Sequence, residues 1–136
     1  MILLIDTNII LDFLLKRSPF YESAKEIMRI CSREDVNGIA ALHTITNIWY
    51  ILRKLPDETR RSVLISICEL LHVVGTSHSE VVNALKTSGF KDFEDCVQTK
   101  CAQSSGADYI ITRNKVDFEL SDVPVLTPDE LMKRMQ

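Results

Sequence analysis

Hydrophobic residues in the chain form short continuous runs that alternate with longer stretches of helical periodicity. The first run, residues 2–5, is wholly apolar and ends at Asp6, which is typical of a strand buried on both faces of a parallel sheet. Similar runs predict four further strands, at residues 38–42, 72–75, 108–112 and 123–126. The pattern therefore predicts a sheet of about five strands.

The stretches between these runs carry apolar residues three or four positions apart, which predicts amphipathic helices. Ser77 with Glu80 and Thr127 with Glu130 have the spacing of capping boxes, which mark helix starts. The predicted helices span residues 7–15, 20–33, 43–53, 57–71, 77–86 and 92–105, with a last helix from residue 127. Strands that alternate with helices indicate a three-layer α/β/α fold around a parallel sheet.

Length and composition exclude several classes of protein. The chain has 136 residues, of which 46% are hydrophobic, so we expect one domain, residues 1–136, with an ordinary core. No apolar run approaches the roughly 18 residues of a membrane span, and the first residues lack signal-peptide features. The four scattered cysteines are expected to be buried, reduced thiols. These features predict a cytoplasmic protein.

The net charge of −3 conceals an uneven distribution. Residues 16–61 hold nine basic and six acidic side chains, whereas residues 80–130 hold ten acids and five bases. The overall balance argues against a simple basic nucleic-acid binder. It is compatible with one acidic site beside a basic rim.

Acidic side chains from separate segments fall where ligands bind in open α/β sheets, at the carboxyl ends of the strands. Asp6 follows the first strand, Asp117 follows the fourth, and Asp92 and Asp95 begin the helix that leads into the fourth strand. If the first and fourth strands are neighbours, these carboxylates meet and repel each other. A hard dication such as Mg²⁺ or Mn²⁺ would offset that repulsion. Polar side chains expected to support such a site are Asn8, Thr112 and Asn114.

Each acid also has an ordinary structural interpretation. Asp6 can cap the helix that begins at Thr7, and Asp95 can be the acid of a capping box with Asp92. Asp117 can be a turn aspartate. Both interpretations stay open for each residue, since only the joint pattern favours a metal site.

Three motifs resemble those of the PIN domain family, the ribonuclease fold used by VapC-like toxins of bacterial toxin–antitoxin pairs. They are I-D-T-N-I-I-L-D at residues 5–12, D-F-E-D-C-V-Q at 92–98 and A-D-Y-I-I-T-R-N-K-V-D-F at 107–118. The resemblance implies a flavodoxin-like, PIN-type sheet and a metal-dependent endoribonuclease. It also implies an RNA substrate, single-stranded or a tRNA loop, together with an antitoxin partner and a homodimer.

The resemblance assigns roles to individual residues of this chain. Asp6, Asp95 and Asp117 match the catalytic, metal-binding acids, with Mg²⁺ or Mn²⁺ as the implied cofactor. Thr112 and Asn114 match the polar pair that precedes the last acid.

One position departs from the family pattern. The helix after the second strand usually carries a glutamate, but the segment H-T-I-T-N-I-W-Y has Asn47 there. An amide keeps a carbonyl oxygen and loses a negative charge, so metal affinity should fall. The alternative function is therefore a catalytically weakened PIN-like module that binds RNA or protein. A phosphoaspartate enzyme is disfavoured, because no second aspartate follows Asp6 two residues on.

Basic side chains near the acidic motifs are candidates for RNA contact. Arg113 and Lys115 lie within the third motif and are expected to bind RNA phosphates. The pairs at residues 53–54 and 60–61 are ordinarily solvated helix surface, but they would hold phosphates if they lay at the rim of the site.

Overall fold

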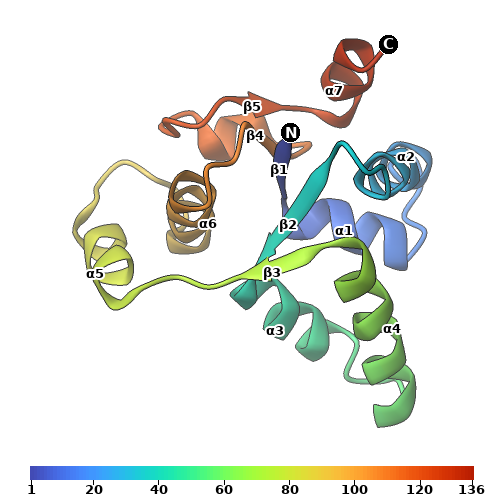
Figure 1. Cartoon of the computed structure of the whole chain (residues 1–136). Helices are drawn as coiled ribbons and strands as arrows, with labels where there is room; N and C mark the ends of the chain where they lie inside the picture. Colours follow the sequence, from blue (N-terminus) through green and yellow to red (C-terminus); the bar gives the residue numbers. More distant parts are fainter.

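Five parallel strands form the centre of the molecule in the computed structural model, which describes residues 1–136 (Figure 1). The strands lie side by side in the order β3-β2-β1-β4-β5. Leu3 of β1 pairs with Gly38 of β2 on one side and with Tyr109 of β4 on the other. The strand bounds are β1 Ile2–Ile5, β2 Asn37–Ala41, β3 His72–Val74, β4 Tyr109–Ile111 and β5 Val125–Leu126.

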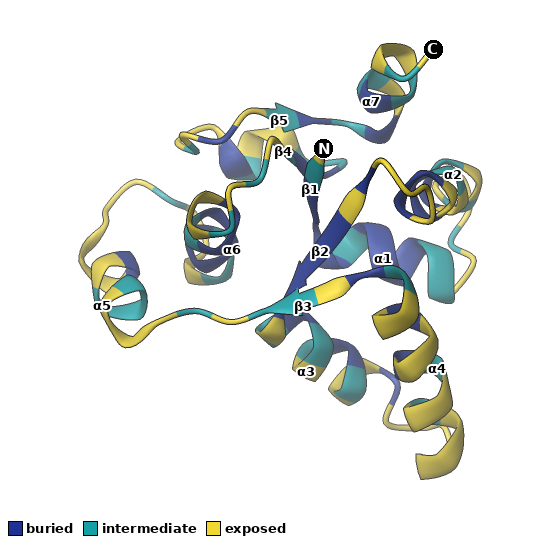
Figure 2. Ribbon diagram, viewed as in Figure 1, coloured by how far each residue is buried: buried dark blue, intermediate teal, exposed yellow.

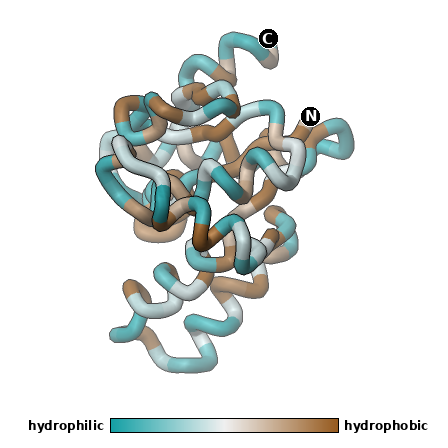
Figure 3. Tube along the Cα trace, turned by 90° about the vertical axis from the view of Figure 1, so that its left-hand side faces the viewer, coloured by the Kyte–Doolittle hydropathy of each residue, from teal (hydrophilic) through white to brown (hydrophobic).

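Helices cover both faces of this sheet, which confirms the predicted three-layer α/β/α architecture. Figure 3 shows hydrophilic and hydrophobic positions alternating along the trace of the outer helices, as amphipathic helices require. The helices are α1 Thr7–Leu14, α2 Tyr21–Cys31, α3 Leu42–Ile51, α4 Asp57–Leu70, α5 His78–Lys86, α6 Phe93–Ser104 and α7 Pro128–Arg134, with a 3₁₀ helix, η1, at Lys115–Phe118.

The apolar run of β1 is explained by two hydrophobic cores, one on each face of the sheet. Leu3 and Ile5 belong to a cluster of 20 buried residues shared with α1, α2, α3, α4 and α7. Leu4 belongs to a cluster of 11 buried residues shared with α5, α6 and η1. Because successive side chains of a strand point to opposite faces, a strand between two cores must be apolar at every position. Figure 2 shows this burial concentrated on the central strands, whereas α4 is largely exposed.

The predicted elements are present, with small shifts at their ends. Both predicted capping boxes form, at Ser77 and at Thr127. The fifth strand is shorter than predicted because the Val123 backbone N–H bonds to the Ser121 hydroxyl, and Pro124 has no N–H to donate. The sequence pattern did not predict η1.

Two further observations concern composition. All four cysteines are free thiols, but Cys68 is exposed, so the expectation that all four are buried was wrong for that residue. None of the helices combines the length with the apolar character that crossing a membrane would require.

The order of the strands fixes the position of a ligand site. The chain moves from β1 to β2 and β3 in one direction, and β4 and β5 lie on the other side of β1. In open α/β sheets, ligands bind at the carboxyl ends of the strands where the order reverses, here between β1 and β4. β1 and β4 are therefore neighbours in the sheet, as the prediction of an acidic site required.

Candidate active site

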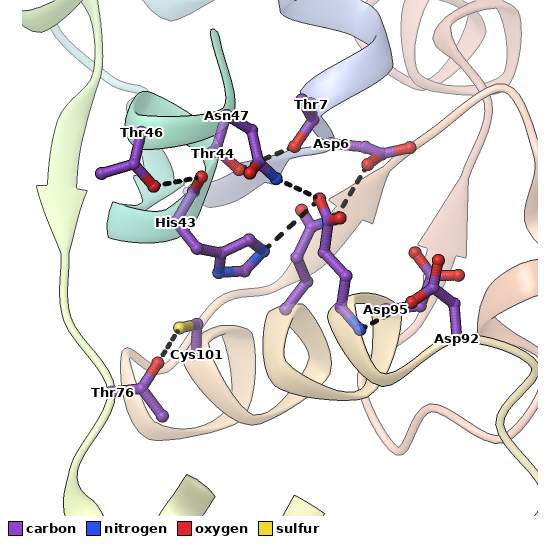
Figure 4. A network of polar contacts seen from close by, with 12 residues as sticks. Asp6, Thr7, His43, Thr44, Thr46, Asn47, Thr76, Asp92, Asp95 and Cys101 are labelled. Carbon is purple, nitrogen blue, oxygen red and sulfur yellow. Dashed lines mark hydrogen bonds and ion pairs between the residues drawn. The ribbon is translucent and has the colours of Figure 1, made fainter. Parts of the chain in front are cut away.

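A pocket of about 400 Å³ lies at the carboxyl ends of β1 and β4, and we call it the acidic pocket. Figure 4 shows Asp6 from the end of β1, Asn47 from α3 and Asp95 from α6 around this space. No lysine or arginine lines it. The lining residues are Asp6, Thr7, Asn8, Leu11, Asn47, Tyr50, Ile51, Asp92, Glu94, Asp95 and Asp117.

Asp6 is held in the pocket by two neutral hydrogen-bond donors. It occupies the N-cap position of α1, but its side chain makes no capping hydrogen bond. Its Oδ1 accepts from Gln98 Nε2 at 2.9 Å, and its Oδ2 accepts from Thr112 Oγ1 at 2.8 Å. Asp6 as a whole residue is only 5% exposed. The capping interpretation is therefore wrong for this side chain, which is fixed by the neighbouring strand and by α6.

Thr112 connects Asp6 to the third motif. The residue follows β4 and is fully buried. Its hydroxyl donates to Asp6 and accepts from the backbone N–H of Asn114 at 3.1 Å. The chain then turns into η1, which carries Asp117 into the lining of the acidic pocket. Asn114 thus supports this arrangement through its backbone.

Asp95 lies in the first turn of α6 and is partly buried. The capping interpretation fails here too, because Asp92 caps α6 by accepting from the Glu94 backbone N–H at 2.9 Å, and the Asp92 backbone N–H does not donate to the Asp95 carboxylate in return. Burial raises the pKa of Asp95 to about 7, with further contributions from the carboxylates of Asp6, Asp92, Asp117 and Glu94. These acids are therefore close enough to disfavour the charged form of Asp95.

The donor chemistry of the pocket fits a hard, hydrated dication. Carboxylate and amide oxygens are the ligands that Mg²⁺ prefers, and the ion usually keeps several waters while it contacts one or two carboxylates. As the side chains stand, no three His, Cys, Asp or Glu residues lie close enough together to hold an ion on their own, so a dication bound here would keep several of its waters. Asp6, Asp95 and Asp117 line the pocket from three separate elements and are the acids that would contact such a hydrated ion.

Glu94 is a pocket residue that the sequence analysis missed. Its Oε1 accepts from Asn47 Nδ2 at 3.0 Å, so α6 places a carboxylate against the position where α3 lacks one. His43 Nε2 lies 3.7 Å from the same oxygen, and burial lowers the pKa of this histidine. The available signal was the third residue of the motif at residues 92–98, a glutamate directly before Asp95.

Gln98 was also missed, although it touches Asp6 directly. It is 1% exposed, and its Oε1 has no hydrogen-bond partner. Its position one turn after Asp95 on α6 was the only sequence signal, because glutamine is common on helix surfaces.

The two predicted RNA contacts are engaged elsewhere. Arg113 Nε donates to Asp12 Oδ2 at 2.8 Å, and the guanidinium lies 4.2 Å from the centre of the Phe20 ring. Lys115 Nζ lies 3.1 Å from Glu130 Oε1. Neither side chain lines the acidic pocket, and RNA binding by either remains a prediction.

Comparisons with known structures agree with the fold. Structural similarity to VapBC-1 from nontypeable Haemophilus influenzae covers 95% of this chain and 99% of that chain, with a TM-score of 0.69 and 19% identity. A toxin–antitoxin complex from Klebsiella pneumoniae matches with a TM-score of 0.68 and 22% identity over 92% of this chain and 96% of that chain.

A third similar structure is VapC20 of Mycobacterium tuberculosis, described as a sarcin-ricin loop cleaving toxin. It matches with a TM-score of 0.62 and 13% identity over 79% of this chain and 86% of that chain. No curated protein matches by sequence. A family model described as a PIN domain matches residues 3–116, a span that contains Asp6 and Asp95 and ends directly before Asp117. The chain belongs to the PIN domain family.

Proposed function

We propose that the protein is a metal-dependent endoribonuclease that hydrolyses RNA phosphodiester bonds in the acidic pocket. One observation carries the proposal: acids from the end of β1, from α6 and from η1 line a single pocket that contains no cation of the protein. Membership of the PIN domain family supports the same activity. The VapC toxin among its structural relatives, described as a sarcin-ricin loop cleaving toxin, supports an RNA substrate.

Asp6, Asp95 and Asp117 would hold the ion, Mg²⁺ or Mn²⁺. Such an ion supplies an activated water and offsets negative charge on the phosphate. The protein's own part is positioning. Gln98 and Thr112 hold Asp6 in one orientation, and Asp92 anchors the turn of α6 from which Asp95 projects.

Glu94 lies next to Asn47, the position where the family pattern has a glutamate. The contact between Asn47 and Glu94 brings a carboxylate to the α3 wall of the pocket, so the charge missing from α3 is supplied by α6. This favours the nuclease over the alternative, a PIN-like module that binds RNA or protein without cleaving it. The single observation in favour of that alternative is the amide at Asn47 itself.

The rim of the pocket offers a contact for RNA. Tyr50 lines the acidic pocket and is 63% exposed. The Arg53 guanidinium lies 4.3 Å from the centre of the Tyr50 ring, and none of the ion pairs in the structure involves Arg53. A cation stacked on an exposed aromatic ring suits the phosphates and bases of a single strand or a tRNA loop.

The proposed biological role is that of a toxin held by an antitoxin. The toxin–antitoxin complexes among the structural relatives support such a partner.

The test is incubation of a mixed RNA pool with the purified chain and Mn²⁺. Cleavage should occur, stop with EDTA, and fall by at least about 100-fold in Asp95→Asn. Asp122→Asn is the matched control, because Asp122 is an exposed acid outside the acidic pocket. RNA binding without cleavage would favour the module, and equal cleavage by both variants would refute the assigned site.

A further inference from the structure

A second pocket, of about 490 Å³, opens directly beside the acidic pocket. The two share Asn47 and Glu94 as a common wall, and we call the second one the side pocket. The rest of its lining consists of four apolar residues and three polar residues, none of them an acid, a lysine or an arginine: Leu42, Val81, Phe93, Val97, His43, Thr46 and Thr76. A ligand group in the side pocket would therefore be adjacent to whatever the acids bind.

The walls of the side pocket suit a flat, uncharged group. No lysine or arginine lines it, and Glu94 borders it, so it would repel a phosphate. Phe93 begins α6 and is 46% exposed, and Leu42 begins α3 and is 55% exposed. Exposed rings and aliphatic side chains beside a nucleic-acid site are typical platforms for unpaired bases.

One polar atom of the side pocket lacks a partner. His43 Nε2 is buried and forms no hydrogen bond, since Glu94 Oε1 lies 3.7 Å away. Buried nitrogen and oxygen atoms are nearly always paired, so a small movement of Glu94, or a hydrogen-bonding group bound in the side pocket, would satisfy this nitrogen. The Thr46 hydroxyl donates to the His43 carbonyl at 3.0 Å, which leaves the lone pairs of its oxygen available as acceptors.

We propose that the side pocket binds one nucleobase of single-stranded RNA, stacked on Phe93 with its edge towards His43, while the adjoining phosphate lies in the acidic pocket. The inference rests on the proposed function, because it requires the phosphate next to this base to be bound in the acidic pocket, on the other side of the shared wall. It restricts the substrate to unpaired segments, since a paired base cannot leave its stack without cost.

The test is a binding measurement that requires no cleavage. A labelled single-stranded RNA decamer and an abasic decamer of equal length are titrated by fluorescence anisotropy with Ca²⁺ in place of Mn²⁺. Phe93→Ala should weaken binding of the normal RNA about tenfold and leave binding of the abasic RNA unchanged. Phe93→Tyr should retain the affinity. Leu120→Ala is the control, because Leu120 is 50% exposed and lies outside both pockets.

His43→Ala is the second variant, and it should weaken the normal RNA several-fold while its thermal unfolding midpoint stays near that of the wild type. If Phe93→Ala and Leu120→Ala bind the normal RNA with equal affinity, the side pocket does not bind a base. A segment of a partner protein would then be the ligand to test for this pocket. Equal weakening of the abasic RNA would also overturn the proposal. A third outcome separates the two proposals. If Phe93→Ala weakens only the normal RNA but the wild type never cleaves RNA, the base site stands and the proposed nuclease activity is refuted.

Discussion

The two aspartates of the first motif, Asp6 and Asp12, are both buried but have opposite surroundings. Asp12 is fully buried and faces two guanidinium groups, that of Arg113 at 2.8 Å and that of Arg17 at 3.6 Å. Asp6 accepts hydrogen bonds from two neutral groups and lies in a pocket with four other acids. Asp12 is thus neutralised by cations of the protein itself, whereas no lysine or arginine lines the pocket that contains Asp6.

The first way to test this contrast is to remove each charge in turn. Asp12→Asn should reduce the free energy of unfolding by about 3 kcal/mol, because it leaves the partly buried Arg113 without its carboxylate. Asp6→Asn should change it by less than about 1 kcal/mol, since lost hydrogen bonding is offset by reduced repulsion with Asp95. Urea unfolding with EDTA measures both, and equal losses would contradict the distinction.

The second test removes a neutral donor from Asp6. Thr112→Val should cost about 1–3 kcal/mol, because Asp6 loses a donor and the buried hydroxyl that serves the Asn114 N–H disappears. Thr112→Ser keeps the hydroxyl and is the control. The two unfolding free energies should differ by the cost of those hydrogen bonds. A valine variant as stable as the serine variant would show that Thr112 does not hold Asp6.

The third test uses pH. The pKa of Asp95 is raised to about 7, above its ordinary value of 3.8, so the folded state retains a proton that the unfolded state releases. The stability contributed by this proton is complete below about pH 4 and is lost as pH rises towards 7. Unfolding in EDTA at several pH values should show this decline in the wild type and a smaller one in Asp95→Asn. Identical profiles would contradict the role of Asp95.

The smallest effect concerns the wall shared by Asn47 and Glu94. Glu94→Gln should weaken Mn²⁺ binding several-fold, because the pocket loses a carboxylate. The swapped variant, Asn47→Glu with Glu94→Gln, should recover most of that affinity by restoring the acid from α3. Calorimetric titration measures each protein, and failure of the swap would show that the two positions do not share one function.

Much of this arrangement could be predicted because it depends on backbone periodicity. The apolar run that ends at Asp6 predicts a central strand and places that acid at its carboxyl end. Paired capping residues set the starts of α5 and α7. The adjacency of β1 and β4 then brings the first and third motifs together.

The parts that could not be predicted depend on side-chain directions. Arg113 follows β4 as expected, but its guanidinium turns to Asp12 because a buried carboxylate there requires a partner. Glu94 and Gln98 reach the acidic pocket because of the rotation of α6, which no local pattern specifies. The capping interpretation of Asp95 was plausible from spacing alone, and only the Asp92–Glu94 bond excludes it.

The proposed nuclease site requires that Asp6, Asp95 and Asp117 bind one divalent cation between them. Isothermal titration with Mn²⁺ tests it most directly, comparing the wild type with an asparagine substitution of each acid and with Asp122→Asn. We expect one Mn²⁺ site in the wild type and in Asp122→Asn, and loss of measurable binding in each of the other three variants. Absence of binding in the wild type, or binding that survives all three substitutions, would contradict it.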